Sequence, residues 1–280
     1  MSPIPAESSS SSAVHVNGVS QPTTELADIG NNITFDSVED TIAAFGRGEF
    51  VVILDDETRE NEGDLIIAAD RVTTEQMAWL IKHSSGFVCI SIPEDTIEYL
   101  GLRMMVPENT DRHKTAYTVT LDYKSGTTTG ISAHDRALTC RMLARASDQV
   151  SKRKRTSQSV PTLNGAATSE ADSPSGSEAD AQSVVLPEHF SRPGHMNPLR
   201  YTEGGVQKRR GHTEAAVDLA IAAGRSRAGI LCELVDPDSP VGGIAARDAC
   251  FKFARNHGLR ICTIEALVQW QRQREQSSTS

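Results

Sequence analysis

The sequence has little positive charge and no long hydrophobic run. Its 37 acidic residues outnumber its 28 basic ones, which gives a formal net charge of −9 at pH 7. This balance argues against nucleic acid as a partner, because proteins that bind it usually carry a basic surface. No apolar stretch approaches the roughly 20 residues that a membrane-spanning helix needs. The first Lys or Arg is Arg47, so we expect neither a signal peptide nor an arginine-rich transit peptide.

Cysteine is scarce as well. The five cysteines are odd in number and contain no C-x-x-C pair, which argues against a disulfide framework and against a zinc ribbon. We therefore expect a reducing compartment, with the cytosol as the default. The chain nevertheless has 280 residues, 38% of them hydrophobic, and this is enough to bury a sizeable core.

Two segments have the composition of disordered chain. Residues 1–34 are rich in Ser, Thr and Asn, and residues 151–185 are a low-complexity mixture with hardly any large apolar residues. The second segment begins with the basic run 152–155, which matches a nuclear address, although a solvated linker is the commoner meaning of such a run. With residues 273–280 as a polar tail, residues 35–272 remain as one α+β domain, a mixed sheet flanked by helices.

Hydrophobic periodicity and capping signals predict the elements of this domain. Apolar residues that recur every three or four positions indicate a helix, whereas short continuous apolar runs are typical of buried strands. The predicted helices are 37–46, 74–83, 133–145, 215–224, 245–257 and a last one that ends near residue 270. The predicted strands are 50–54, 65–69, 87–92, 117–123, 230–235 and 259–263.

The most informative motif is the acidic run DDETRENEGD at 55–64, between two predicted strands. Carboxylates crowded into ten residues repel one another, and a divalent cation together with a polyhydroxylated substrate would relieve this repulsion. The motif therefore indicates a metal and substrate site. Taken alone, an acidic run is more often a solvated turn.

A second motif lies far downstream, where RRGHTE at 209–214 leads into a predicted helix. His212 and Thr213 fall at the helix N-terminus, where free backbone amides and the helix dipole favour an anion such as phosphate. Arg209 adds a full positive charge beside them. A simple helix cap is the alternative for either residue alone, but the arginines and the distant acidic loop together favour a phosphate site.

With four further motifs, these two resemble the 3,4-dihydroxy-2-butanone 4-phosphate synthases of riboflavin biosynthesis. The resemblance covers roughly residues 35–148 and 186–272, and its other motifs are HSSGFVC, TTTGISAHDR, RPGH and GILCEL. It implies a monofunctional, fungal-like lyase that converts D-ribulose 5-phosphate into L-3,4-dihydroxy-2-butanone 4-phosphate and formate. It also implies Mg²⁺ or Mn²⁺, two per active site, and a homodimer. The low-complexity insertion departs from the family pattern without removing a motif.

The resemblance also implies roles for individual residues. Glu60 and His212 are the expected metal ligands. The expected proton carriers are His195 and Glu233, with Asp55 and Glu62 as further candidates, and the acid that removes the first proton stays open. The expected substrate-binding residues are Arg59, Glu60, Asp64, Thr115, Arg209, Arg210, Gly211, His212, Thr213 and Glu233.

Two other functions are compatible with these residue types. A metal-dependent sugar-phosphate isomerase or aldolase would use the same acids, histidine and phosphate site, but it would release no formate. An inactive scaffold would have lost metal and proton-transfer positions, whereas Glu60, His212, His195 and Glu233 are all present. Cys89 is as compatible with the core as with the site, and we assign it no role.

Overall fold

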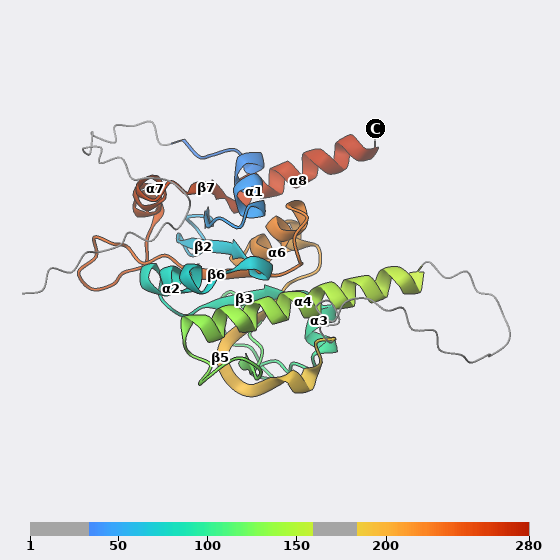
Figure 1. The fold of residues 1–280 in the computed structure, drawn as a ribbon. Helices are drawn as coiled ribbons and strands as arrows, with labels where there is room; N and C mark the ends of the chain where they lie inside the picture. Colours follow the sequence, from blue (N-terminus) through green and yellow to red (C-terminus); the bar gives the residue numbers. More distant parts are fainter. Residues whose placement is uncertain (1–33, 159–183, 280) are drawn as a thin grey trace, which may run out of the picture. The chain divides into compact units, whose positions relative to one another are not determined.

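A seven-stranded mixed sheet organises the structure, a computed structural model that describes residues 34–158 and 184–279 (Figure 1). The strand order is β4-β5-β3-β6-β2-β1-β7. Four neighbouring pairs are antiparallel, whereas β1–β7 and β3–β5 are parallel. The predicted α+β class is confirmed. The strands are β1 Val51–Leu54, β2 Gly63–Ala68, β3 Cys89–Ile92, β4 Leu121–Tyr123, β5 Phe190–Arg200, β6 Gly229–Glu233 and β7 Arg260–Thr263.

Helices cover both faces of this sheet. α1 and α8 pack with α6 against β1, β2, β6 and β7, whereas α2 packs on α4, which contacts β3, β4 and β5. Two 3₁₀ turns lie at Ala69–Arg71 and Pro187–His189. The α-helices are α1 Val38–Gly46, α2 Thr74–His83, α3 Glu94–Tyr99, α4 Ala133–Gln158, α5 Gly205–Lys208, α6 His212–Ala222, α7 Arg247–Asn256 and α8 Ile264–Thr279.

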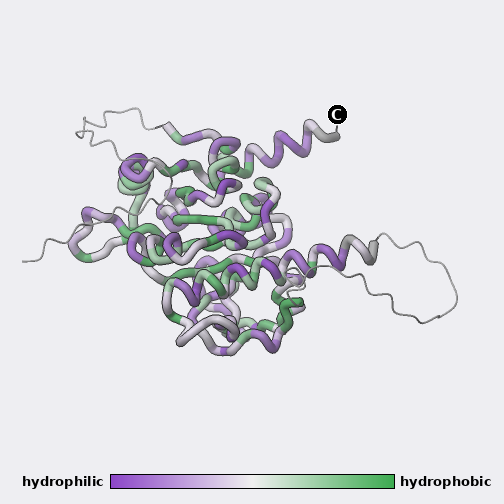
Figure 2. Tube along the Cα trace, viewed as in Figure 1, coloured by the Kyte–Doolittle hydropathy of each residue, from purple (hydrophilic) through white to green (hydrophobic). Residues whose placement is uncertain are grey.

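Because helices cover both faces of the sheet, the central strands appear in the sequence as continuous apolar runs. Val51, Ile53 and Ile66 belong to the core cluster shared with α1, α6 and α8. Their neighbours Val52 and Leu65 are equally buried and point to the opposite face, because side chains alternate along a strand. Figure 2 shows these strands as hydrophobic and the far ends of α4 and α8 as hydrophilic.

Three predicted boundaries were wrong. α4 continues from the predicted end at residue 145 to Gln158, so residues 151–158 are helical and do not belong to a disordered insertion. The ammonium of Lys154 lies 2.9 Å from the carboxylate of Asp95, and the guanidinium of Arg153 lies over the ring of Tyr99. These contacts with α3 extend the helix. Arg153 and Lys154 of the basic run therefore contact the folded domain.

The predicted polar tail 273–280 was also wrong, since α8 runs to Thr279. Gln271 donates to Asp218 at 2.9 Å, and Gln207 donates to Glu275 at 2.7 Å, so the polar end of α8 is joined to α5 and α6. The predicted strand 117–123 is shorter, with only isolated bridges before residue 121.

Other predictions lie outside the described residues. Disorder was predicted for residues 1–34 and for the insertion, and the structure describes neither 1–33 nor 159–183. Among the helices that it does describe, none has an apolar stretch long enough to cross a bilayer.

Candidate active site

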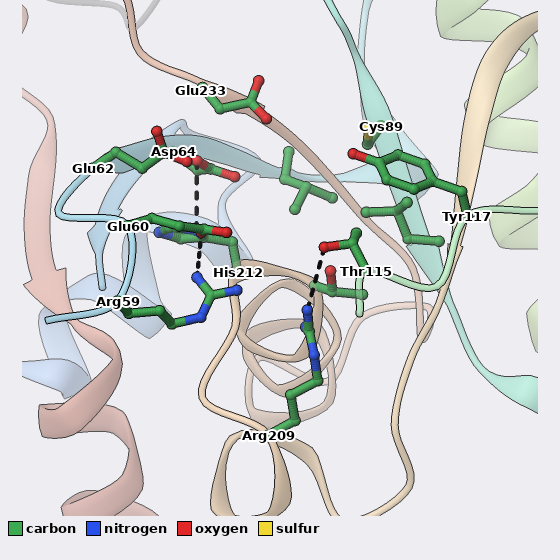
Figure 3. A pocket seen from close by; sticks show the side chains of 13 residues that line it. Arg59, Glu60, Glu62, Asp64, Cys89, Thr115, Tyr117, Arg209, His212 and Glu233 are labelled. Atoms are coloured by element: carbon green, nitrogen blue, oxygen red, sulfur yellow. Dashed lines mark hydrogen bonds and ion pairs between the residues drawn. The ribbon is translucent and has the colours of Figure 1, made fainter. Parts of the chain in front are cut away.

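A pocket lies where the β1–β2 loop, the start of α6 and the end of β6 meet (Figure 3). Four acidic side chains gather at one end of it, and Arg209 approaches with Thr115 from another direction. The lining residues are Arg59, Glu60, Glu62, Asp64, Cys89, Thr115, Tyr117, Leu199, Arg209, His212, Thr213, Leu231 and Glu233.

The acidic loop keeps its shape because Asp55 accepts hydrogen bonds from the loop itself. Its Oδ1 accepts from the amide of Glu62 at 3.0 Å, and its Oδ2 accepts from the amide of Glu60 at 3.0 Å. Nη1 of Arg59 donates to the same Oδ2 at 2.8 Å. The Asp55 side chain is fully shielded from solvent. Both of its oxygens are therefore used to organise the loop.

His212 is the first residue of α6 and is only 6% exposed. Its Nε2 lies 3.1 Å from the carbonyl oxygen of Ile53. Because a carbonyl can only accept, Nε2 carries the proton and Nδ1 keeps its lone pair. That Nδ1 faces Asp64 at 3.6 Å and Glu60 at 3.8 Å. Burial lowers the pKa of His212 to about 4, so the imidazole is neutral at pH 7.

The carboxylates around this imidazole are buried or half-buried and repel one another. Burial raises the pKa of Asp64 well above its usual range, and the charges of Glu233 and Glu62 raise it further. Burial likewise raises the pKa of Glu62 to about 7, with Glu60 and Glu233 adding to the effect. Oδ1 of Asp64 is buried without a hydrogen-bond partner. A divalent cation in the pocket would satisfy this oxygen and relieve the repulsion.

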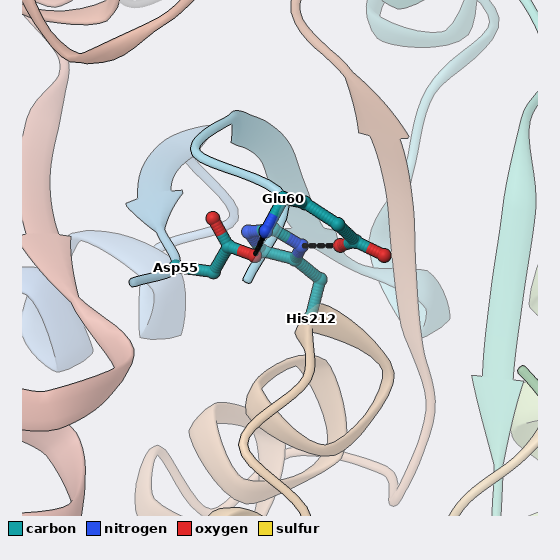
Figure 4. Close-up of side chains that lie close together, drawn as sticks. All are labelled: Asp55, Glu60 and His212. Atoms are coloured by element: carbon teal, nitrogen blue, oxygen red, sulfur yellow. Dashed lines mark hydrogen bonds and ion pairs between the residues drawn. The ribbon is translucent and has the colours of Figure 1, made fainter. Parts of the chain in front are cut away.

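The donor set fits such a cation. Asp55, Glu60 and His212 each offer one ligand atom, and these atoms all lie within 4.8 Å of one another (Figure 4). Since the oxygens of Asp55 already accept three hydrogen bonds, Glu60 and His212 are the better ligands. A neutral imidazole whose other nitrogen donates to a backbone carbonyl is typical of metal-binding histidines. Carboxylate oxygens suit Mg²⁺, and the imidazole makes the site suitable for Mn²⁺ as well.

The α6 N-terminus adds an anion site to the same pocket. Its N-cap, Gly211, forms no side-chain cap bond, so the amides of His212 and Thr213 remain for a ligand. Nη1 of Arg209 donates to Glu214 at 2.6 Å. The Glu214 side chain is 1% exposed. Nη2 donates to the carbonyl oxygen of His113 at 3.1 Å and lies 3.4 Å from Oγ1 of Thr115. Glu214 and His113 thus hold the arginine in place, and Nε and the second hydrogen of Nη1, which have no partner among the described residues, are left for an anion.

Most of the predicted site residues meet in this pocket although they are far apart in the chain. The structure brings together Arg59, Glu60, Glu62, Asp64, Thr115, Arg209, His212, Thr213 and Glu233.

Four predicted residues do not line this pocket. Asp55 supports the acidic loop, and Arg210 pairs with Glu265 beside a separate cavity. Gly211 is the N-cap, where a Cβ would lie 2.3 Å from Nη1 of Arg209. His195 lies on β5 with 41% of its side chain exposed. Its ring and Asp122 form a pair, Nδ1 to Oδ2 at 2.7 Å.

Sequence reasoning missed part of the lining. Tyr117, Leu199 and Leu231 line the pocket, but in the sequence they resemble ordinary core residues. Cys89, to which we gave no role, also lines it. Burial raises the pKa of its thiol well above the usual range, so the thiol stays protonated. Without the sheet register, no local signal distinguishes these residues from the core.

The fold and this pocket define a metal-dependent enzyme that acts on a small phosphorylated substrate. The comparisons with known proteins narrow the class. The family model of 3,4-dihydroxy-2-butanone 4-phosphate synthase matches residues 39–270. A Schizosaccharomyces pombe protein named 3,4-dihydroxy-2-butanone 4-phosphate synthase is 46% identical over 235 residues, 84% of this chain and 96% of the relative.

Solved structures agree. A 3,4-dihydroxy-2-butanone 4-phosphate synthase in complex with two magnesium ions superimposes with a TM-score of 0.69 at 43% identity, covering 86% of this chain and 99% of the other. The Candida albicans enzyme superimposes with a TM-score of 0.65 at 40% identity, over 84% and 97% of the two chains. The chain belongs to the 3,4-dihydroxy-2-butanone 4-phosphate synthase family, as the motifs predicted.

Proposed function

We propose that this protein converts D-ribulose 5-phosphate into L-3,4-dihydroxy-2-butanone 4-phosphate and formate, and so supplies the four-carbon unit for riboflavin. The pocket supports this reaction because it combines an acidic end that can bind a divalent cation with a cationic helix N-terminus. The neutral imidazole of His212 beside the unpartnered Oδ1 of Asp64 is the observation that carries the proposal.

The cationic end would hold the phosphate of the substrate. Arg209 would donate from its guanidinium, and the backbone amides of His212 and Thr213 would donate from the start of α6. Thr115, whose Oγ1 lies 3.4 Å from Nη2 of Arg209, lines the same end. The sugar chain would then extend toward the carboxylates, where Asp64 would receive its hydroxyl groups.

At the acidic end, Glu60 and His212 would hold Mg²⁺ or Mn²⁺, and two ions per site follow from the solved relative with two magnesium ions. A bound cation supplies Lewis acidity for the charge that develops on the substrate oxygens. Arg59, whose Nη1 contacts Glu60, balances the charge of the loop. We assign proton transfer to the carboxylate oxygens of Glu62 and Glu233, which line the pocket.

We further propose a homodimer that forms through an apolar face, defined as Phe87, Met105, Val106 and Ile131. Their exposed fractions are 49%, 46%, 47% and 51%, and contact with a second copy would remove this apolar surface from water. The Phe87 ring lies 6.0 Å from the ring of Tyr117, measured between centroids, and Tyr117 lines the pocket. At Phe87, the apolar face therefore adjoins the pocket.

A second copy would also give His195 a function. Asp122 accepts from the backbone amide of His195 at 2.8 Å and lies 2.7 Å from its Nδ1, which leaves Nε2 for proton exchange. Gly130 packs directly against both residues, so its neighbour Ile131 brings the apolar face close to the histidine. Because His195 does not line the pocket of its own chain, we propose that it serves the pocket of the other copy.

Mixed dimers test this arrangement. If His195 and Glu233 act across the interface, His195→Asn and Glu233→Gln should each be inactive, yet their coexpression should restore about a quarter of the normal activity, since half the dimers are mixed and each has one intact site. If the two residues act within one chain, no mixture recovers activity, and the proposal for His195 is wrong.

We propose the cytosol as the place of action. The five cysteines are all free and buried, which supports a reducing compartment. Fractionation of cells followed by immunodetection would test this, and recovery with organelles would contradict it.

The reaction itself is tested by incubating the purified protein with D-ribulose 5-phosphate and Mg²⁺. We expect stoichiometric formate and a four-carbon phosphate, both lost on addition of a chelator. A sugar-phosphate isomerase would yield a five-carbon isomer without formate, and an aldolase would yield two aldehyde or ketone fragments. Either product pattern would refute the proposed reaction.

A further inference from the structure

We propose that Ser85 is a positioning residue for Glu233, holding one carboxylate oxygen so that the other faces the substrate. The inference rests on the proposed function, in which Glu233 transfers protons. Ser85 belongs to the HSSGFVC motif, and none of the roles above includes it.

The contact is direct. The hydroxyl of Ser85 donates to Oε2 of Glu233 at 2.7 Å. Oγ of Ser85 also accepts from the backbone amide of Phe87 at 3.2 Å and lies 3.3 Å from Sγ of Cys232. Because the amide is a fixed donor, it occupies a lone pair of the serine oxygen and leaves the hydroxyl hydrogen to point at the carboxylate. Oε1 of Glu233 has no hydrogen-bond partner among the described residues and remains for the pocket.

The loop that carries Ser85 is itself anchored to β6. The backbone amide of Ser85 donates to the carbonyl of Glu233 at 2.8 Å, and Ser84 forms a β-bridge with Leu234. From the other side, Nη1 of Arg136 lies 3.4 Å from the carbonyl oxygen of Gly86. Serine and glutamate are thus held at a set distance by the backbone, so the side-chain contact needs little additional ordering.

Glu233 needs such a contact because its neighbours repel it. Asp64 lies opposite Glu233 in the β2–β6 register, and the charge of Glu233 contributes to the raised pKa of both Glu62 and Asp64. A carboxylate at the end of a strand would turn away from two other acids if nothing held it. The hydroxyl of Ser85 opposes this movement with a charge-assisted hydrogen bond.

Steady-state kinetics of Ser85→Ala provide the test. We expect kcat to fall about tenfold, as for the loss of a hydrogen bond to a charged group, while KM changes less than about twofold, since the contact acts on the proton carrier and not on substrate binding. Ser85→Thr keeps the hydroxyl at an exposed position and should restore most of kcat. Ser226→Ala is the matched control: it also removes a serine–carboxylate hydrogen bond, to Asp148 at 2.7 Å, outside the pocket, and should leave kcat unchanged.

A double-mutant cycle separates this inference from the role of Glu233. In Glu233→Asp the carboxylate is shorter by one methylene and cannot reach Ser85, so adding Ser85→Ala should have little further effect. If Ser85→Ala lowers kcat equally in both backgrounds, or leaves kcat normal in the parent protein, the positioning role is wrong while the proposed reaction stands. Full turnover by Glu233→Gln would overturn both the proton-transfer role and the inference built on it.

Discussion

Replacing Arg209 by alanine should weaken substrate binding without slowing the chemical step. The guanidinium would contact the phosphate, which is remote from the bonds that break and is held alike in the ground and transition states. Two charge-assisted hydrogen bonds at about 1.5 kcal/mol each correspond to a rise in KM of roughly 100-fold. We expect kcat to stay within about twofold of the parent value.

The same change has a second consequence. Glu214 is 1% exposed and pairs with Arg209 at 2.6 Å, and its Oε1 accepts from the amide of Thr202 at 3.1 Å. Removing the arginine leaves a buried carboxylate without its cation, at a cost of about 3 kcal/mol. For a domain of this size, that lowers Tm by roughly 10 °C.

The double variant Arg209→Ala with Glu214→Gln separates the two effects. Glutamine has no charge to compensate and can still accept from Thr202, so the double variant should recover most of the lost Tm. The raised KM should persist, because the phosphate contact is still missing. The assays are formate release over a range of ribulose 5-phosphate concentrations and calorimetric melting. An unaltered KM in Arg209→Ala, or a KM restored by the second substitution, would refute the reasoning.

Two further predictions concern the metal site and the sheet. Glu60→Gln and His212→Ala should each abolish formate production and strongly reduce Mn²⁺ binding, measured by titration calorimetry. The control Asp56→Asn, in the exposed part of the same loop, should change neither property. Normal Mn²⁺ binding by either ligand variant would disprove the assignment. Gly194→Ala should lower the free energy of unfolding, measured in urea, by at least about 2 kcal/mol, because its Cβ would lie 2.1 Å from the backbone of β4. The control Gly46→Ala meets only an ordinary contact at 3.5 Å and should leave this free energy unchanged. Equal unfolding midpoints for the two variants would contradict the prediction.

The sequence by itself determined the local structure wherever one periodicity ran undisturbed. The apolar runs of β1, β2 and β6 and the capped start of α2 were located to within about two residues, because burial on both faces and capping leave a local pattern. The residue types that form the site could also be recognised in the sequence. Carboxylates, a histidine and arginines in ordered motifs together indicated a cation site and an anion site.

The strand β5 could not be predicted from the local sequence pattern. Its segment, Phe190–Arg200, contains two prolines and lacks alternation, and it becomes a strand because β3 and β4 pair with its two edges. The full length of α4 similarly depends on Asp95 and Tyr99, which are distant in the chain.

Only the tertiary structure decided what each polar group of the site does. Asp55 and Glu62 are similar acids in one motif, yet loop amides and Arg59 occupy the oxygens of Asp55, whereas Glu62 lines the pocket. His195, expected among the proton carriers, lies outside its own pocket. The physical reason is that hydrogen-bond partners and burial, which set the role of a polar side chain, come from segments that the fold brings together and that no local pattern specifies.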